Sequence, residues 1–188
     1  MSQVSGKFIL NSTITLDKLN QSGAVLNQKM IWSGSQWVPY TDIYTKATTT
    51  VQNITSTTHQ NITELVSDTL PVGLYQWIYH GVCQSTNTGV GLGLRLNVST
   101  AASNLCNGKW SIAQAAAGTA SNFVYDQLNT SVNITSASVA AANSDFIVRG
   151  EGIINITSSG TVVMQARGET ATSVSIRPGS YLVFKRLS

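Results

Sequence analysis

The side chains best suited to acid–base catalysis are few and widely spaced in this sequence. There are two histidines, His59 and His80. A glycosidase needs two carboxylates within roughly 5–10 Å of each other, and the sequence suggests such a pair only for Asp145 and Glu151, on either side of an expected strand start. No other acid–base pair is indicated by the carboxylates, which are Asp17, Asp42, Glu64, Asp68, Asp126, Asp145, Glu151 and Glu169.

The sequence also lacks the short motifs that mark catalytic and metal sites. It has no His-Glu-x-x-His, Gly-x-Ser-x-Gly or Cys-x-x-Cys pattern, which are typical of zinc proteases, serine hydrolases and redox or zinc sites. Cys83 and Cys106 have no paired spacing, so we interpret them as buried free thiols; a disulfide across facing strands is the alternative that stays open. We therefore expect no catalytic residue, no metal, no cofactor and no enzymatic activity.

Charge is scarce for a chain of this size. Charged residues make up 10% of the 188 residues, against about 25% in a typical soluble domain. The basic residues are scattered and the net charge is +3, which argues against binding to nucleic acid. No apolar run approaches the ~20 residues of a membrane-spanning helix, so we expect no membrane insertion. The first apolar run has only three residues, which is too short for a signal peptide.

Residues 71–188 alternate between apolar and polar residues, which predicts β-strands. In residues 89–99, Val90, Leu92, Leu94, Leu96 and Val98 share one face, while glycines and polar residues take the other. Turn signals separate about eight such segments, and this spacing without a convincing helix favours an antiparallel β-sandwich or jelly roll. The other expected strands are Leu74–Cys83, Trp110–Ala115, Phe123–Ile134, Phe146–Ile156, Thr161–Arg167, Thr172–Ile176 and Ser180–Arg186.

Residues 43–70 form a polar segment with no glycine or proline. Val51 and Ile62 are eleven residues apart, as are Ile54 and Leu65, and eleven residues correspond to three helical turns. These four residues are therefore predicted to form the core of a short, multi-stranded coiled-coil stalk. The alternative is a disordered, threonine-rich linker.

Residues 1–42 contain two of the four tryptophans, Trp32 and Trp37, on either side of a four-residue loop with a glycine. This arrangement predicts a hairpin in which the two rings face each other across the strands. Pro39 is expected to end the pairing. An isolated hairpin is marginal in water, so we expect it to pack against another protein or another copy of the chain.

This stretch resembles the modular connectors of tailed-phage fibre proteins. In those connectors, TIT-x-x-KL is followed by GA and then by Q-x-x-x-W-x-G-x-x-W-V-P. Here Met30 and Ile31 replace the more common Val-Leu pair, which is a mild departure. The matching residues are Thr13, Ile14, Thr15, Lys18, Leu19, Gly23, Ala24, Gln28, Trp32, Gly34, Trp37, Val38 and Pro39.

The C-terminal zone resembles the jelly-roll heads of phage fibres, which are similar in shape to tumour-necrosis-factor-like trimers. The stretches that carry the resemblance are 73–77, 150–166 and 177–187. The resemblance implies a structural virion protein, assembled in the host cytoplasm as a homotrimer. Its head would meet a glycan or protein receptor on the host surface through the loops 84–88, 101–108 and 136–143.

In that interpretation residues 1–42 attach the fibre to other virion proteins of the capsid or the tail. Whether it is a head fibre or a tail fibre stays open at this stage. The stalk of residues 43–70 would hold three chains in register, and residues 71–188 would form the knob. The residues expected to make the virion contact are Phe8, Ile9, Ile14, Leu16, Leu19, Trp32 and Trp37.

Two other classes of function remain to be weighed. A stand-alone carbohydrate-binding β-sandwich would stack sugar rings on aromatic side chains, and Tyr75, Trp77, Tyr79 and Trp110 are the candidates. The competing interpretation of these four residues is a trimer core. The third class is a depolymerase, against which stand the small head and the missing carboxylate pair.

Overall fold

A computed structural model describes residues 29–32, 37–113, 121–128, 131–135, 139, 141–171 and 173–188, none of which is helical. The chain divides into two compact units, residues 1–42 and 43–188. In the first, β1 (Lys29–Trp32) and β2 (Trp37–Tyr40) form the predicted antiparallel hairpin, with Trp32 opposite Trp37. Pairing continues through Pro39, which lies opposite Met30. The expectation that Pro39 ends it is wrong, because a proline is tolerated where its nitrogen faces away from the partner strand.

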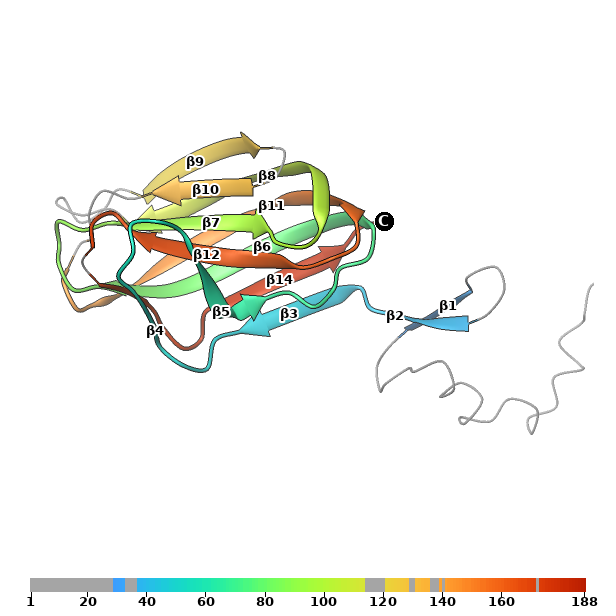
Figure 1. Cartoon of the computed structure of the whole chain (residues 1–188), viewed down its shortest axis with the longest axis horizontal. Helices are drawn as coiled ribbons and strands as arrows, with labels where there is room; N and C mark the ends of the chain where they lie inside the picture. Colours follow the sequence, from blue (N-terminus) through green and yellow to red (C-terminus); the bar gives the residue numbers. More distant parts are fainter. Residues whose placement is uncertain are drawn as a thin grey trace, which may run out of the picture. The chain divides into compact units, whose positions relative to one another are not determined.

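The second unit is a two-layer antiparallel β-sandwich (Figure 1). Its large sheet contains, in spatial order, β3 (Ile43–Ala47), β14 (Tyr181–Arg186), β6 (Gly73–Ser85), β11 (Asp145–Ser158), β8 (Ala102–Ala113) and β9 (Ser121–Leu128). The short β13 (Val174–Ile176) pairs with one end of β6, and β4 (Gln52–Ile54) pairs with β13.

The small sheet has four strands. Their spatial order is β10 (Ser131–Thr135), β7 (Leu92–Val98), β12 (Val162–Gly168) and β5 (Gln60–Val66). Every strand pair in both sheets is antiparallel. The predicted β-sandwich is therefore confirmed for this unit.

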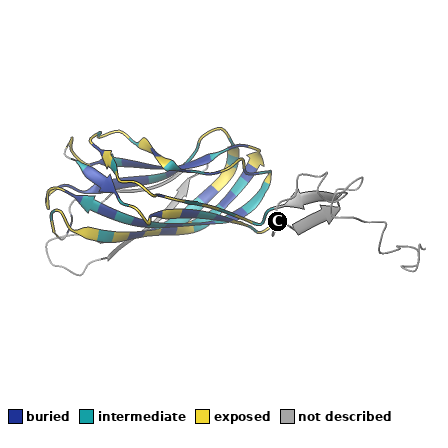
Figure 2. Ribbon diagram, turned by 90° about the horizontal axis from the view of Figure 1, so that it is seen from below, coloured by how far each residue is buried: buried dark blue, intermediate teal, exposed yellow. Residues whose placement is uncertain are grey.

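The core lies between the two sheets, because each strand sends alternate side chains to opposite faces. Figure 2 shows this alternation as bands of buried and exposed residues along the strands. Trp77 and Trp110 lie with ring centroids 5.3 Å apart, and Tyr79 meets Trp110 edge-on at 5.9 Å. The small sheet covers these rings with Leu92, Leu94, Leu96, Met164 and Ala166, all fully buried. Burial of each large apolar side chain contributes about 1.5–3 kcal/mol.

The predicted coiled-coil stalk over residues 43–70 is wrong. This segment contains β3, β4 and β5, so the sandwich starts at Ile43 and not at residue 71. Ile54, Ile62 and Leu65 are fully buried in the core of the sandwich, whereas Val51 is 43% exposed. The four residues therefore do not form one stripe, because β-pairing with β12 and β13 fixes their orientation.

Two other expectations need correction. The single strand expected over 123–134 is two strands, β9 and β10, which pair with different partners. Residues 102–108, expected in an exposed loop, belong to β8 and pair with β11. No described residue belongs to a helix that could span a membrane. The predicted anchoring residues Phe8, Ile9, Ile14, Leu16 and Leu19 lie outside the described residues, and of Trp32 and Trp37 only the backbone is described.

Candidate functional site

The solvent-facing side of the large sheet carries the most distinctive surface among the described residues. In β6, inward Tyr75, Trp77 and Tyr79 are buried, so the intervening side chains point outward. Polar outward residues such as Gln76, Gln84, Asp145 and Lys185 flank a central group of nine outward residues on three strands, and we define the outer face by these nine. They are Ile78, His80 and Val82 from β6, Ile147, Arg149, Glu151 and Ile153 from β11, and Tyr181 and Val183 from β14.

Apolar side chains are unusually frequent on this outer face. Ile147 is 45% exposed and Tyr181 is 37% exposed. Ile78, Val82, Ile153 and Val183 are half-buried among their neighbours on the sheet. The face is thus open to solvent in the single chain, although five of its nine defining residues are aliphatic.

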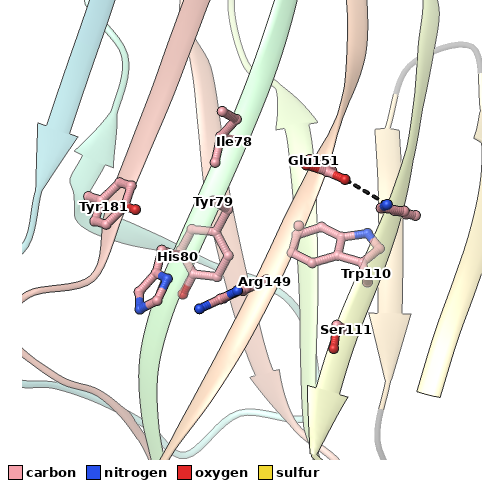
Figure 3. A pocket seen from close by; sticks show the side chains of 10 residues that line it. Ile78, Tyr79, His80, Trp110, Ser111, Arg149, Glu151 and Tyr181 are labelled. Carbon is pink, nitrogen blue, oxygen red and sulfur yellow. Dashed lines mark ion pairs between the residues drawn. The ribbon is translucent and has the colours of Figure 1, made fainter. Parts of the chain in front are cut away.

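A hollow of about 560 Å³ lies in the middle of the outer face. Its floor contains Tyr79, Gly150 and Trp110, which are directly opposite one another in the registers of β6, β11 and β8. Tyr79 and Trp110 turn their rings into the core and Gly150 has none, so the floor is mainly backbone. The rim consists of Ile78, His80, Arg149, Glu151, Lys109, Ser111 and Tyr181 (Figure 3).

The rim is held by two side-chain pairs. The rings of His80 and Tyr181 stack with centroids 5.2 Å apart and an interplanar angle of 3°. Lys109 Nζ and Glu151 Oε1 form an ion pair at 2.7 Å, the dashed line in Figure 3. Arg149 lies between His80 and Ser111 in the strand register, and its guanidinium has no hydrogen bond or ion pair within the part of the chain that is described. The hollow therefore offers one unpaired cation beside an aromatic pair.

The side chains of Tyr79 and Cys83 are buried beneath the hollow. Burial raises the pKa of the Tyr79 hydroxyl well above its usual value, and raises the pKa of the Cys83 thiol to about 12. Cys83 and Cys106 are both buried and free, as expected. A thiol with so high a pKa is protonated at neutral pH and unreactive. Neither Tyr79 nor Cys83 therefore supplies a nucleophile to the hollow.

The two carboxylates that stand near each other in the sequence are far apart in the sheet. Asp145 and Glu151 are six residues apart on β11, and a strand rises about 3.4 Å per residue, which separates them by roughly 20 Å. Asp145 instead pairs with Arg177 at 3.5 Å. The described residues also contain no group of three or more histidines, cysteines and carboxylates that could hold a metal ion.

No family model and no curated protein matches this chain.

The structure separates the aromatic residues proposed for sugar binding from the surface. Tyr75, Trp77, Tyr79 and Trp110 are all fully buried within the single chain, so they neither stack on sugars nor form a core between subunits. The outward residues of the hollow were not singled out as a site from the sequence. The signal for them was the alternation in β6 and β11, which assigns His80 and Arg149 to the face opposite the buried rings.

Proposed function

We propose that this chain is a structural attachment protein of the tailed-phage fibre type, located in the virion. Three copies associate through the outer face of the large sheet, and the sandwich forms a knob that meets a glycan or protein receptor on the host surface. The N-terminal unit attaches the trimer to other virion proteins of the capsid or tail. The observation that carries the proposal is the half-apolar outer face, left open in the single chain.

The order of strand pairing supports a jelly-roll head. With β4, β13 and the β8–β9 hairpin set aside, eight strands remain, namely β3, β5, β6, β7, β10, β11, β12 and β14. The first pairs with the last, β3 with β14, and the second with the seventh, β5 with β12. The third pairs with the sixth, β6 with β11, and the fourth with the fifth, β7 with β10. This nested pattern is what a long hairpin rolled into two sheets produces, and viral capsid and lectin domains use it.

The outer face supports self-association on physical grounds. Contiguous apolar surface on a soluble protein usually marks an interface. Lys109 and Glu151 neutralise each other at 2.7 Å, so Arg149 is the one charge of the defined outer face that a neighbouring copy would desolvate without a partner of its own chain. The low charge content of the chain, 10%, is also typical of surfaces that become buried on assembly.

The N-terminal unit supports a separate role in attachment. The boundary between the two compact units falls at residues 42 and 43. The β1–β2 hairpin, with Trp32 opposite Trp37, is a type of element that is marginal alone and gains stability from a partner. The sequence resemblance of this segment to phage-fibre connectors points to a virion protein as that partner.

The test is the solution mass of the full chain by light scattering. Three times 20.0 kDa, unchanged on dilution to low micromolar concentration, is the expected result. A stable monomer at all concentrations contradicts the proposal, because a fibre head needs partner subunits to cover the outer face.

A second candidate function is saccharide binding in the hollow by a monomeric sandwich. It is favoured by the stacked His80 and Tyr181 at the rim, with Arg149 and Ser111 as hydrogen-bond donors beside them. The two candidates compete for the same face, because subunits that cover it also cover the hollow. A monomer that binds on a glycan array, and loses binding in Tyr181→Ala, would select this second candidate.

A further inference from the structure

The outward side of the small sheet brings together two arginines and a histidine from three elements. Arg95 comes from β7, Arg167 from β12, and His59 immediately precedes β5. Arg95 lies opposite Gln165, and Arg167 lies opposite Gly93, two residues farther along the same pair of strands. Diagonal neighbours of this kind have side chains within reach of each other.

Arg95 is fixed by a chain of hydrogen bonds across three strands. Its Nε donates to Gln165 Oε1 at 2.8 Å, and its Nη2 donates to the same oxygen. Gln165 Nε2 in turn donates to Asn61 Oδ1 at 2.7 Å. Gln165 is only 8% exposed, so its side chain holds this series of hydrogen bonds in place. Because an amide oxygen is neutral, the positive charge of Arg95 is not cancelled within the described residues.

Arg167 is directed by a glycine. A Cβ atom on Gly93 would lie 2.7 Å from Cγ of Arg167 and 2.8 Å from its Nε. The absence of a side chain at Gly93 therefore lets Arg167 lie across β7, on the strand that carries Arg95.

His59 completes the cluster. It is half-buried, and its Nε2 atom is buried without a hydrogen-bond partner among the described residues. Burial first, and then the charges of Arg95 and Arg167, lower the pKa of His59 to about 4. The imidazole is thus neutral at pH 7. Gln60 pairs with Ala166, so His59, one residue earlier, is next to Arg167 in the strand register.

We propose that Arg95, Arg167 and His59 form a binding site for an oxyanion, a phosphate or carboxylate group such as anionic surface polymers carry. Guanidinium groups present fixed pairs of N–H donors that match these anions. The anion would offset the charge of Arg95, which donates to a neutral amide oxygen, and would give His59 Nε2 an acceptor. The site is on the sheet opposite the outer face, so its occupancy requires neither the trimer nor attachment to a virion.

The experiment follows the imidazole resonances of His59 by NMR in the intact protein at constant ionic strength. Inorganic phosphate and acetate are titrated separately, each exchanged against sodium chloride. A bound anion favours the imidazolium, so the pKa of His59 should rise by at least about 1 unit at saturation. A shift with phosphate alone, with acetate alone or with both assigns the anion class.

Matched variants connect the shift to the site. Arg95→Gln and Arg167→Gln should each weaken binding at least tenfold, whereas Arg149→Gln, the same change on the large sheet, should leave it unchanged. Urea unfolding of each variant checks that the fold is intact. Arg167 takes no part in the hydrogen bonds that join Arg95, Gln165 and Asn61. Arg167→Gln therefore still tests the proposal if Arg95→Gln unfolds. A site with millimolar affinity, a binding free energy of about 4 kcal/mol, is saturated by 50 mM ligand. The proposal is overturned if neither phosphate nor acetate saturates the shift in the pKa of His59 by that concentration. It is also overturned if this pKa shifts equally in Arg95→Gln, Arg167→Gln and Arg149→Gln.

Discussion

Single residues set the spacing of the core where the large rings meet the sheet. A Cβ on Gly108 would collide with Trp77, and a Cβ on Gly150 would lie 2.5 Å from the ring of Trp110. The two tryptophans can pack flat against β8 and β11 only because these positions lack side chains. The same glycine, Gly150, forms part of the floor of the hollow, so core packing and surface shape depend on one position.

Gly150→Ala should destabilise the sandwich by about 1–3 kcal/mol, because overpacking a close-packed core displaces rigid neighbours. The measurement is urea unfolding followed by tryptophan fluorescence. Gly89→Ala is the matched control, since its Cβ would meet only Asn87 Oδ1 at an ordinary 3.5 Å. It should change stability by less than about 0.5 kcal/mol. Equal effects of the two changes would show that Trp110 does not rest on Gly150.

Glu64 provides a pH dependence of stability. Hydrogen bonds from the hydroxyl and backbone of Thr49 and Thr50 lower its pKa from 4.5 to about 2. A carboxyl with a lowered pKa in the folded state contributes its stabilisation above the unfolded value of 4.5, and loses it as the pH falls towards 2. Glu64→Gln should therefore show a shallower loss of stability between pH 4.5 and 2. Parallel curves for the two proteins in urea unfolding would refute this.

At the scale of elements, strict alternation made β7 predictable, apolar segments between turn residues made β6, β11, β12 and β14 predictable, and an irregularity concealed β5. Ile62 and Leu65 are both buried but three residues apart, where a regular strand would bury every second residue. The register between β5 and β12 shifts between Val163 and Gln165. Across this shift β5 advances five residues, from Asn61 to Val66, while β12 advances two, so the extra residues of β5 interrupt the two-residue spacing. The resulting spacing of three imitates a helix in the sequence.

Ile62→Ala tests the corrected role of the supposed stalk. Ile62 is fully buried and Val51 is 43% exposed. Ile62→Ala should therefore cost about 2–5 kcal/mol in chemical unfolding of the sandwich, and Val51→Ala less than about 0.5 kcal/mol. In a coiled coil both residues would occupy the seam and both changes would dissociate the chains. Equal losses of stability in Ile62→Ala and Val51→Ala would contradict the burial of Ile62 in the sandwich and favour the coiled coil.

The residues of the hollow could not have been assembled from the sequence. His80, Ser111, Arg149 and Tyr181 come from four strands that are far apart along the chain. Alternation tells which face each occupies, but strand register decides which residues stand side by side. The start of β8 was missed for a related reason. Residues 101–108 are small or polar with little alternation, and it is pairing with β11 that makes them a strand.

At the scale of the whole sandwich, the two sheets have surfaces of different character. The outer face of the large sheet is half apolar, and the outward side of the small sheet holds Arg95 and Arg167. The two proposals therefore assign self-association to the large sheet and anion binding to the small sheet. Each proposal can be tested by substitutions on its own sheet.

Ile147→Lys should break the proposed trimer without unfolding the head. Ile147 is 45% exposed, so a lysine there is solvated in the single chain but would be buried without a partner between subunits. Light scattering should give the mass of one chain at concentrations where the parent is trimeric. Val51→Lys is matched in exposure at 43% and should stay trimeric. If Ile147→Lys keeps the parent's mass, the outer face is not the interface.

The nested pairing of strands also orders events in time. Closing a loop costs more entropy as the loop lengthens, so β7 with β10 should pair early and β3 with β14 last. β14 lies between β3 and β6 and carries Tyr181 and Val183, which complete the outer face. Association of subunits should then wait until each chain has finished folding. Pulsed hydrogen exchange during refolding checks this order, since early protection of β14 amides would contradict it.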